Sequence, residues 1–328
     1  KDLILWNYNN ACQFGKAWDE YTKQARGLIT DSDGNIMARP FPKFFNLNEN
    51  EESKIENLPV EVPVITEKLD GSLGIQYYDR DRVYIATRGS FTSDQAIFAY
   101  NWINKIDLWK QDFKEGYTYL YEIIYPENRI VVDYKGRQEL VLLAVIDNET
   151  GIDIGCYEEA KRLGFSAPKN YIDLNIDKLV ELMSKLGSND EGFVVRYPNG
   201  LRLKMKGAEY VRLHRLITGF STKSIWECLM NNQDLVPILE SVPDEFYNWV
   251  KEKETKLKYK FEQVYRHIVD VLEKVKELPD RKSQALKIKE LYSENSGVLF
   301  AMLDEKDYAK IIWKGLKPKW ELPFKKEI

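Results

Sequence analysis

One short segment places a lysine, an aspartate and two glycines where a predicted strand ends. Residues 67–74 have the sequence EKLDGSLG. The residues before it, 60–65, are rich in β-branched side chains, and residues 74–78 again have strand-like composition, so Lys68 is predicted on a tight connection between two strands. A lysine there can act as a covalent nucleophile once its ammonium, with an ordinary pKa of about 10.4, has lost its proton. The alternative is an ordinary turn, in which Asp and Gly supply local hydrogen bonds and positive φ.

Further charged residues follow in positions where burial would be costly. Glu122 lies inside a run of aromatic and aliphatic residues that predicts a strand, and an unpaired carboxylate there is expensive. Glu191 precedes another strand. In the next one, period two places Lys204 and Lys206 on one face with Arg202, where three cations repel one another unless something anionic covers them. The alternatives are an edge-strand charge for the lysines and a solvated strand end for Glu191.

The elements that must position these residues change character along the chain. Up to about residue 220, strands and short helices alternate with turn signals, whereas residues beyond Ser221 have helical periodicity. Pro279 should end the first long helix, and at least two more are expected near 285–292 and 311–313. We therefore predict an α+β domain over 1–220 and an all-α domain over 221–328. The apolar stripe of the long helix recurs at steps of three and four: Leu257, Phe261, Val264, Ile268, Val271, Leu272 and Val275.

Composition fits a cytoplasmic enzyme. The chain has 328 residues, 44% of them hydrophobic, and a formal net charge of −4, so it is long enough for two domains. No apolar run reaches the roughly 18 residues that span a membrane, and no signal peptide is visible, so no membrane partner is expected. The odd number of widely spaced cysteines predicts reduced thiols in the cytoplasm.

Several segments in order resemble one family. The sequence resembles the single-strand RNA ligases of the phage T4 RNA ligase 1 type, within the covalent nucleotidyltransferase superfamily, from about Tyr8 to His214. One departure is Arg88, where the family often has lysine. The resembling segments are RGLI at 26–29, ARPFPKFFNLNE at 38–49, EKLDG at 67–71, ATRGS at 86–90, Glu122 with PENRIV at 126–131, LLAV at 142–145, EG at 191–192, KMK at 204–206 and YVRLH at 210–214.

The resemblance implies a fold, a reaction and cofactors. The fold is a nucleotidyltransferase (ATP-grasp-like ligase) core of antiparallel sheets with helices, followed by the all-α domain. Lys68 would attack the α-phosphate of ATP, carry AMP and pass it to a 5′-phosphate RNA end, and a 3′-hydroxyl would then displace AMP. Magnesium, or manganese in its place, is the implied metal. The partner would be single-stranded RNA or a nicked tRNA loop, in RNA repair by a monomeric enzyme of the cytoplasm, the host's if the gene is from a phage.

The resemblance also implies roles for individual residues. Lys204 and Lys206 would neutralise charge on the α-phosphate and help to keep Lys68 unprotonated. Arg26 and Lys43 would hold the outgoing phosphates. Because the net charge is negative, the basic surface must be local to such residues.

Other positions would contact the nucleotide or a metal. Glu122 would accept hydrogen bonds from the ribose, and Glu191 would hold the metal or its water shell. Tyr8 and Phe45 would pack on adenine, although ordinary core packing is the alternative for Phe45. Tyr210 matches a residue that the family needs for ligation. The full predicted set is Lys68, Lys204, Lys206, Glu191 and Arg88 in catalysis; Tyr8, Arg26, Lys43, Phe45, Glu67, Asp70, Gly71, Glu122 and Gly192 at the nucleotide; Glu191 and Asp234 at the metal; and Tyr210.

Three alternative functions stay open. The predicted helical tail lacks the short, evenly spaced strands of an OB-fold, the domain that DNA ligases and capping enzymes add to the same core, which favours an RNA ligase. A DNA ligase or a guanylyltransferase is the alternative within the enzymes. A non-catalytic RNA-binding protein that keeps the fold is the third.

Overall fold

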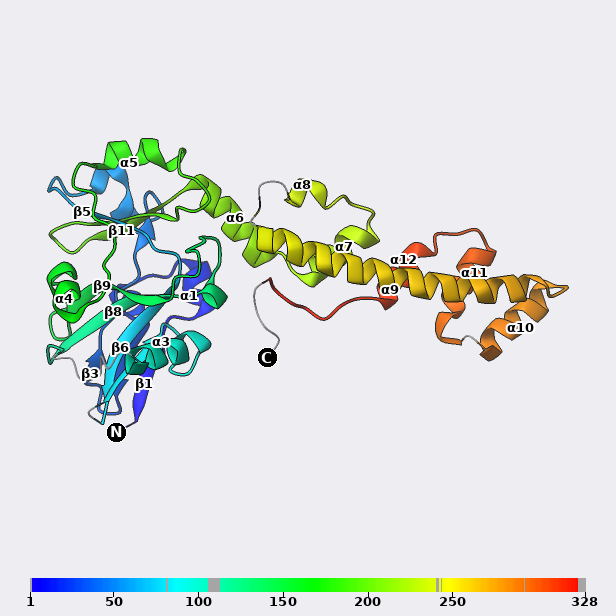
Figure 1. Ribbon diagram of the computed structural model, residues 1–328, viewed down its shortest axis with the longest axis horizontal. Coiled ribbons are helices and arrows are strands. Elements are labelled where there is room, and N and C mark those ends of the chain that lie inside the picture. Colours follow the sequence, from blue (N-terminus) through cyan, green and yellow to red (C-terminus); the bar gives the residue numbers. More distant parts are fainter. Residues whose placement is uncertain are drawn as a thin grey trace. The chain divides into compact units, whose positions relative to one another are not determined.

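The computed structural model describes residues 2–80, 82–105, 113–239, 242, 244–291 and 293–323. The chain divides into two compact units, Lys1–His214 and Arg215–Ile328 (Figure 1). Among the residues described, all strands belong to the first unit, and the regular elements of the second are helices. Within that described part, no helix is both long and apolar enough to cross a membrane.

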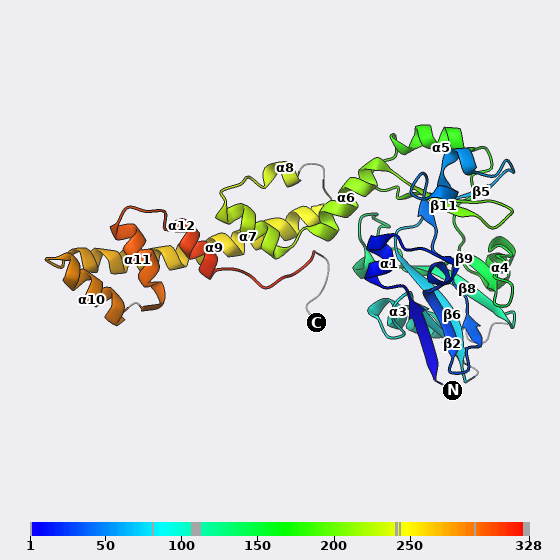
Figure 2. The same ribbon diagram turned by 180° about the vertical axis from the view of Figure 1, so that it is seen from behind.

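Three sheets form the framework of the first unit (Figure 2). The first has the order β1-β2-β3, with bounds Leu3–Asn7, Arg26–Asp31 and Ile36–Ala38. The second has the order β4-β11-β10-β5, with bounds Phe45–Asn46, Arg202–Lys206, Gly192–Arg196 and Val64–Glu67. The third has the order β7-β6-β8-β9, with bounds Arg82–Thr87, Ser72–Asp79, Tyr117–Ile124 and Glu139–Asp147. The expected antiparallel pairing is found throughout except between β4 and β11, which are parallel.

The third sheet packs on both of its faces. One face is covered by α3 (Asp94–Lys105) and α4 (Tyr157–Leu163), and Ile103 and Leu163 lie in the same core as Tyr119. A second core joins the sheet to β1-β2-β3. The other helical elements of this unit are α1 (Asn10–Gly15), α2 (Glu20–Gln24), the 3-10 turns η1 (Glu51–Ser53), η2 (Ile55–Asn57) and η4 (Pro126–Asn128), α5 (Ile176–Met183) and α6 (Ala208–Gly219), which begins in this unit.

The strands of the second sheet alternate between core and cavity. Such period-two alternation directs successive side chains to opposite faces. The core face carries Ile65, Phe193, Val195, Leu203 and Met205. The opposite face lines a cavity with Val64, Thr66, Val194, Arg196, Arg202, Lys204 and Lys206. The three predicted cations on one face of β11 are therefore confirmed.

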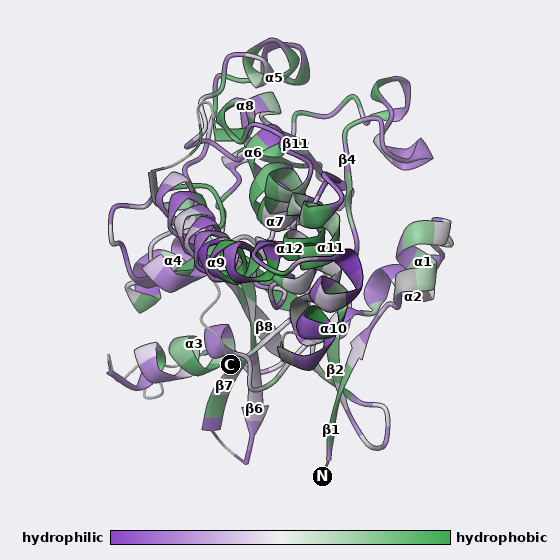
Figure 3. Cartoon of the chain, turned by 90° about the vertical axis from the view of Figure 1, so that its right-hand side faces the viewer, coloured by the Kyte–Doolittle hydropathy of each residue, from purple (hydrophilic) through white to green (hydrophobic). Residues whose placement is uncertain are grey.

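The second unit has its own helical core. Its elements are α7 (Thr222–Met230), α8 (Val236–Leu239), α9 (Asp244–Lys276), α10 (Arg281–Leu291), η5 (Ser293–Asn295), α11 (Ser296–Leu303) and α12 (Ala309–Gly315). The predicted stripe of α9 is confirmed, because Ile268, Val271 and Val275 are buried with Leu299 and Ile312. The rest of α9 is largely hydrophilic (Figure 3). The helix ends at Lys276, shortly before the proline that was expected to stop it.

Gly192 begins β10 in a place that admits no side chain. Its φ is +139°, and a Cβ would lie 1.9 Å from the carbonyl oxygen of Met205. We expect Gly192→Ala to lower the free energy of unfolding by about 3 kcal/mol or more, since neighbouring backbone must move. Gly200→Ala is the matched control: its φ is +88° with open space around it, so it should cost only about 1–2 kcal/mol. Urea unfolding measures both, and equal losses would contradict this account.

Candidate active site

A cavity of about 700 Å³ opens in the first unit, within the size range of small-molecule and cofactor sites. Its lining comes from β5, β10 and β11 of one sheet and from β6, β8 and β9 of another. The connection from β5 to β6, residues 68–71, passes from the first of these sheets to the second and lines the cavity throughout. The predicted position of Lys68 between two strands is thus confirmed.

One carboxylate contacts two lysines in the cavity. The Nζ of Lys68 lies 2.8 Å from Oε2 of Glu191, and the Nζ of Lys206 lies 2.9 Å from Oε1 of the same residue. The Glu191 side chain is only 3% exposed. The backbone N–H of Lys68 donates to the carbonyl of Gly192 at 2.9 Å. The β5–β6 connection and the start of β10 are therefore fixed to each other beside the Lys68 amine.

The electrostatics of Lys68 differ from the expectation. Burial lowers the pKa of Lys68, but the carboxylates of Glu191 and Glu122 outweigh it, and the net pKa is raised above its ordinary value of 10.5. The expectation that the β11 cations keep this amine neutral is therefore wrong for the arrangement seen here. A carboxylate, and not a cation, is the group in contact with Lys68.

Lys204 is the lysine whose pKa is lowered. Burial, followed by the charges of Lys43 and Lys206, lowers the pKa of Lys204 to about 8. Its Nζ also lies 5.5 Å from the centroid of the Phe44 ring. Burial and the neighbouring cations destabilise the protonated form of Lys204, and an anion beside it would stabilise that form. This part of the cavity is therefore suited to a phosphate.

Glu122 on β8 is buried, and burial raises its pKa to about 8, with Lys68 opposing the rise. Gly71 packs directly against it: a Cβ there would lie 2.6 Å from the carbonyl oxygen of Ile123 and 3.1 Å from Oε1 of Glu122. The glycine thus permits close approach of the 68–71 connection to β8. Glu122 can accept a hydrogen bond as a carboxylate or donate one when protonated.

Asp70 is engaged by the protein itself. Its Oδ2 accepts from the backbone N–H groups of Val131 and Val132, each at 3.0 Å, and its Oδ1 accepts from the Tyr210 hydroxyl at 2.8 Å. The backbone N–H of Asp70 donates to the hydroxyl of Tyr134 at 2.7 Å. These bonds fix the connection next to Lys68, and the nucleotide contact expected of Asp70, which lines the cavity, stays a prediction.

Tyr210 completes this network from α6. Tyr210→Phe would leave Oδ1 of the buried Asp70 without that donor, and we expect a loss of about 1–3 kcal/mol in the free energy of unfolding. Tyr197→Phe is the control, because Tyr197 is a buried tyrosine that directly follows β10 and does not line the cavity. A Tyr210→Phe protein as stable as the parent would show that the hydrogen bond contributes nothing.

Two arginines extend the cationic lining. Arg26 on β2 is buried, which lowers its pKa, and its Nη1 has no hydrogen-bond partner in the described part of the chain. An unsatisfied buried guanidinium N–H that lines a cavity is suited to an anionic ligand. Arg88 follows β7 and donates from Nη1 to the hydroxyl of Tyr8 at 2.7 Å. Both arginines line the cavity, as does the predicted Glu67.

Some predicted residues lie outside the cavity lining. Phe45 is 3% exposed and packs on Trp18, so the core-packing alternative accounts for it. The Nζ of Lys43 lies 5.0 Å from the Trp18 ring centroid and 5.4 Å from that of Phe45. Tyr8 reaches the lining only through its bond to Arg88. Asp234 belongs to the second unit, where its Oδ1 accepts from a backbone N–H, and its metal role stays a prediction.

The sequence reasoning left out one side of the cavity. Arg202 and Arg196 both approach Oδ2 of Asp153, at 2.5 and 3.6 Å, and Arg202 lies 4.1 Å from the Phe41 ring centroid. Alternation in β11 had already placed Arg202 on a face with Lys204, and the same argument applied to β10 could have placed Arg196 on a face with Val194. Asp153 follows β9 and carries no sequence signal of its own.

Comparison with known proteins decides the family. The RNA ligase family of the T4 RNA ligase 1 type matches residues 24–211. The chain belongs to this family. The RNA ligase of Rhodothermus phage RM378 is 25% identical over 350 residues, which is 81% of this chain and 77% of the phage protein. A Thermovibrio ammonificans protein, named provisionally as an RNA ligase, is 28% identical over 273 residues, 78% of this chain and 70% of its own length. The family predicted from the sequence of this RNA ligase is therefore confirmed.

Similarity to solved structures is remote. An Aquifex aeolicus protein, named provisionally as an ATP-dependent DNA ligase, is 16% identical, with a TM-score of 0.43 over 88% of this chain and 92% of its own. A Naegleria gruberi RNA ligase variant with AMP and Mn is also 16% identical, with a TM-score of 0.38. That match covers 47% of this RNA ligase and about half, 52%, of the Naegleria chain.

Proposed function

We propose that this RNA ligase is ATP-dependent and joins a 5′-phosphate to a 3′-hydroxyl end through an AMP adduct on Lys68. The observation that carries the proposal is the place of Lys68: a partly buried amine in a nucleotide-sized cavity whose lining includes Lys204, Lys206 and Arg26. The family match supports RNA as the substrate class. We further propose a covalent nucleotidyltransferase core over 1–220 and a helical domain over 221–328.

Each step of the proposed reaction forms one bond to phosphorus and breaks another. The neutral Nζ of Lys68 attacks the α-phosphorus, a phosphorus–nitrogen bond forms, the bond to pyrophosphate breaks, and the amine proton passes to solvent or buffer. The 5′-phosphate of the RNA then attacks the same phosphorus and releases the lysine. Finally the 3′-hydroxyl of RNA attacks the activated 5′-phosphate, and AMP leaves with the electrons of the broken anhydride bond.

The surrounding residues support these displacements by charge and by position. Lys204 and Lys206 lie along one face of β11, where they would stabilise charge that develops on the transferred phosphate. Arg26 offers a buried N–H without a partner to the same group. Glu122 would accept hydrogen bonds from the ribose hydroxyls, as the resemblance implies. Asp70 and Tyr210 hold the connection that carries the nucleophile.

The carboxylates of the cavity suit a hard dication. Among the described residues, no group of three or more His, Cys, Asp or Glu forms a complete metal cage. Magnesium is commonly held by only one or two carboxylates, with waters and substrate phosphates completing the shell. The charge of Glu191 raises the pKa of Glu122 and that of Lys68, and we propose that Glu191 holds the ion. Bound there, magnesium or manganese would neutralise phosphate charge as a Lewis acid.

The natural substrate is proposed to be single-stranded RNA or a nicked tRNA loop, sealed by a monomer. The test uses the full chain with ATP or GTP labelled at the α-phosphorus, Mg²⁺ and a 5′-phosphorylated RNA. We expect label on the protein from ATP, its transfer to RNA, and a joined RNA product. Label from GTP alone would identify a guanylyltransferase. Label from ATP with sealing only of DNA would identify a DNA ligase, and no label with retained RNA binding would identify a binding protein.

A further inference from the structure

The segment from α12 to Trp320 concentrates positive charge in a chain of net charge −4. Its 13 residues from Tyr308 to Trp320 include four lysines and no acidic residue. All four lysines are exposed, and none makes an ion pair with another residue among those described. We call Lys310, Lys314, Lys317, Lys319 and Trp320 the basic strip.

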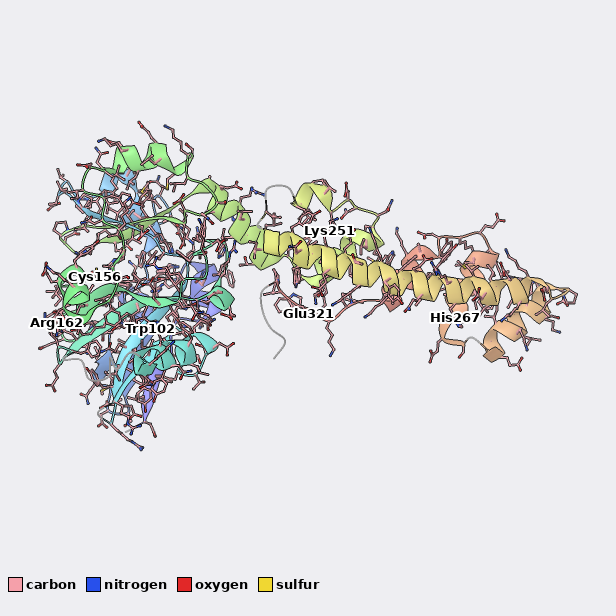
Figure 4. The ribbon with its side chains drawn as sticks, viewed as in Figure 1. Trp102, Cys156, Arg162, Lys251, His267 and Glu321 are labelled. Atoms are coloured by element: carbon pink, nitrogen blue, oxygen red, sulfur yellow. The ribbon has the colours of Figure 1, made fainter. Side chains whose placement is uncertain are left out.

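The neighbouring helix α9 pairs several of its lysines with carboxylates. There Lys251 and Lys258 both pair with Glu254, and Lys256 pairs with Glu252. Lys251 on α9 and Glu321, which directly follows the basic strip, are labelled in Figure 4. The carboxylate of Glu321 pairs with Lys253 of α9 and not with a lysine of the basic strip. Several surface lysines of this unit are thus neutralised locally, whereas no lysine of the strip has an ion-pair partner among the described residues.

The strip is also fixed in place. The Thr222 hydroxyl donates to the carbonyl of Lys319 at 2.5 Å, and the Thr222 backbone N–H donates to that of Glu321 at 3.1 Å. Trp226 Nε1 donates to the carbonyl of Trp313 at 2.6 Å. These bonds hold the backbone of the strip along α7. Lys310 and Lys314, four apart on α12, repel each other by a few tenths of a kcal/mol.

Trp320 adds an aromatic surface to the charge. Its side chain is 58% exposed, and no ring stacks on it within the described part of the second unit. An exposed aromatic ring beside unpaired lysines is the combination by which proteins bind single-stranded nucleic acid: cations contact phosphates and the ring stacks on a base. An anionic protein surface would use the lysines but gives no reason for the exposed indole.

We propose that the basic strip binds single-stranded RNA of the ligation substrate, with the lysines on phosphates and Trp320 stacked on a base. The proposal rests on the proposed ligase function, since it assigns part of that substrate's contacts to the second unit. The residues of the basic strip lie outside the cavity lining. Removal of their side chains should therefore weaken RNA binding and leave transfer of AMP to Lys68 unchanged.

The test compares two variants of the full chain with the parent. The strip variant carries Lys310→Ala, Lys314→Ala, Lys317→Ala and Lys319→Ala, and the matched control carries Lys251→Ala, Lys256→Ala and Lys258→Ala on α9. Affinity for a 5′-phosphorylated single-stranded RNA is measured against salt concentration. Each lost phosphate contact reduces the steepness of log affinity against log salt concentration by about 0.7. The slope of the strip variant should therefore be smaller in magnitude than that of the parent by about 3, and the slope of the control variant should change much less. Trp320→Ala should weaken binding by about fivefold to a hundredfold.

The remaining readouts separate the possible failures. Thermal unfolding checks that each variant is folded, and ATP labelling of Lys68 checks the first unit. A parent that labels and seals RNA while the strip and control variants keep its RNA affinity would overturn the strip proposal alone. Loss of binding to phosphatidylserine vesicles, with RNA affinity unchanged, would also overturn it. A parent that does not label would overturn the proposed function instead.

Discussion

Lys68→Ala should abolish transfer of AMP from ATP to the protein, with a drop of about 10³-fold or more. The physical reason is that no other described amine in the cavity occupies the connection between β5 and β6. The measurement is label retained on the denatured protein after incubation with α-labelled ATP. The same variant should still seal an RNA whose 5′ end already carries AMP, because that step forms no bond to the lysine.

Lys169→Ala is the matched control for this result. Lys169 lies beside β5, where its backbone exchanges hydrogen bonds with Glu67, but its Nζ lies over the Tyr171 ring at 4.8 Å and it does not line the cavity. Its removal should leave labelling near the parent level. If Lys68→Ala protein still accepted label, the covalent role of this residue would be lost. If the Lys68→Ala protein also failed to seal the pre-adenylylated RNA, the substitution would have damaged more than the nucleophile.

Local patterns were sufficient to predict much of the fold. β-branched runs and strict alternation are physical consequences of a strand that buries one face, and they located β5, β8, β10 and β11. The helical stripe of α9 follows from the same logic at period 3.6. The parallel pairing of β4 with β11 could not be predicted in this way, since a two-residue strand has no pattern, and its partner is remote in sequence.

The site was predictable in its residue types and not in its contacts. Alternation showed that Lys204 and Lys206 share a face, but it does not say which group lies opposite them. Only the fold reveals that Glu191 lies between Lys206 and Lys68, which reverses the expected direction of the Lys68 pKa. The nucleotide contact of Asp70 stays a prediction, but its hydrogen-bond partners could not be predicted, because they lie about 60 and 140 residues away in the sequence.

Glu191→Gln should lower the pKa of Lys68, because it removes the anion 2.8 Å from the amine. With the pKa raised, the neutral fraction of Lys68 at pH 8 is small, and it increases about tenfold for each unit by which the pKa falls. Reaction with an amine-directed reagent, followed by mass spectrometry across pH 7 to 10, should therefore show Lys68 about tenfold or more reactive in the variant. Glu67→Gln, which removes another cavity carboxylate, should leave the profile unchanged, and equal profiles for Glu191→Gln and the parent would contradict the proposed control of the amine.

AMP transfer in the same Glu191→Gln protein distinguishes two roles of this carboxylate. If Glu191 acted only by keeping Lys68 protonated, labelling from ATP would increase along with the reactivity of the amine. The proposed hold on a metal ion, together with the contact to Lys206, predicts the opposite: labelling should fall by about 10²-fold although more of the nucleophile is neutral. A carboxylate that both suppresses the amine and supports its attack would let the ligase keep Lys68 protonated until the nucleotide and its metal compete for Glu191.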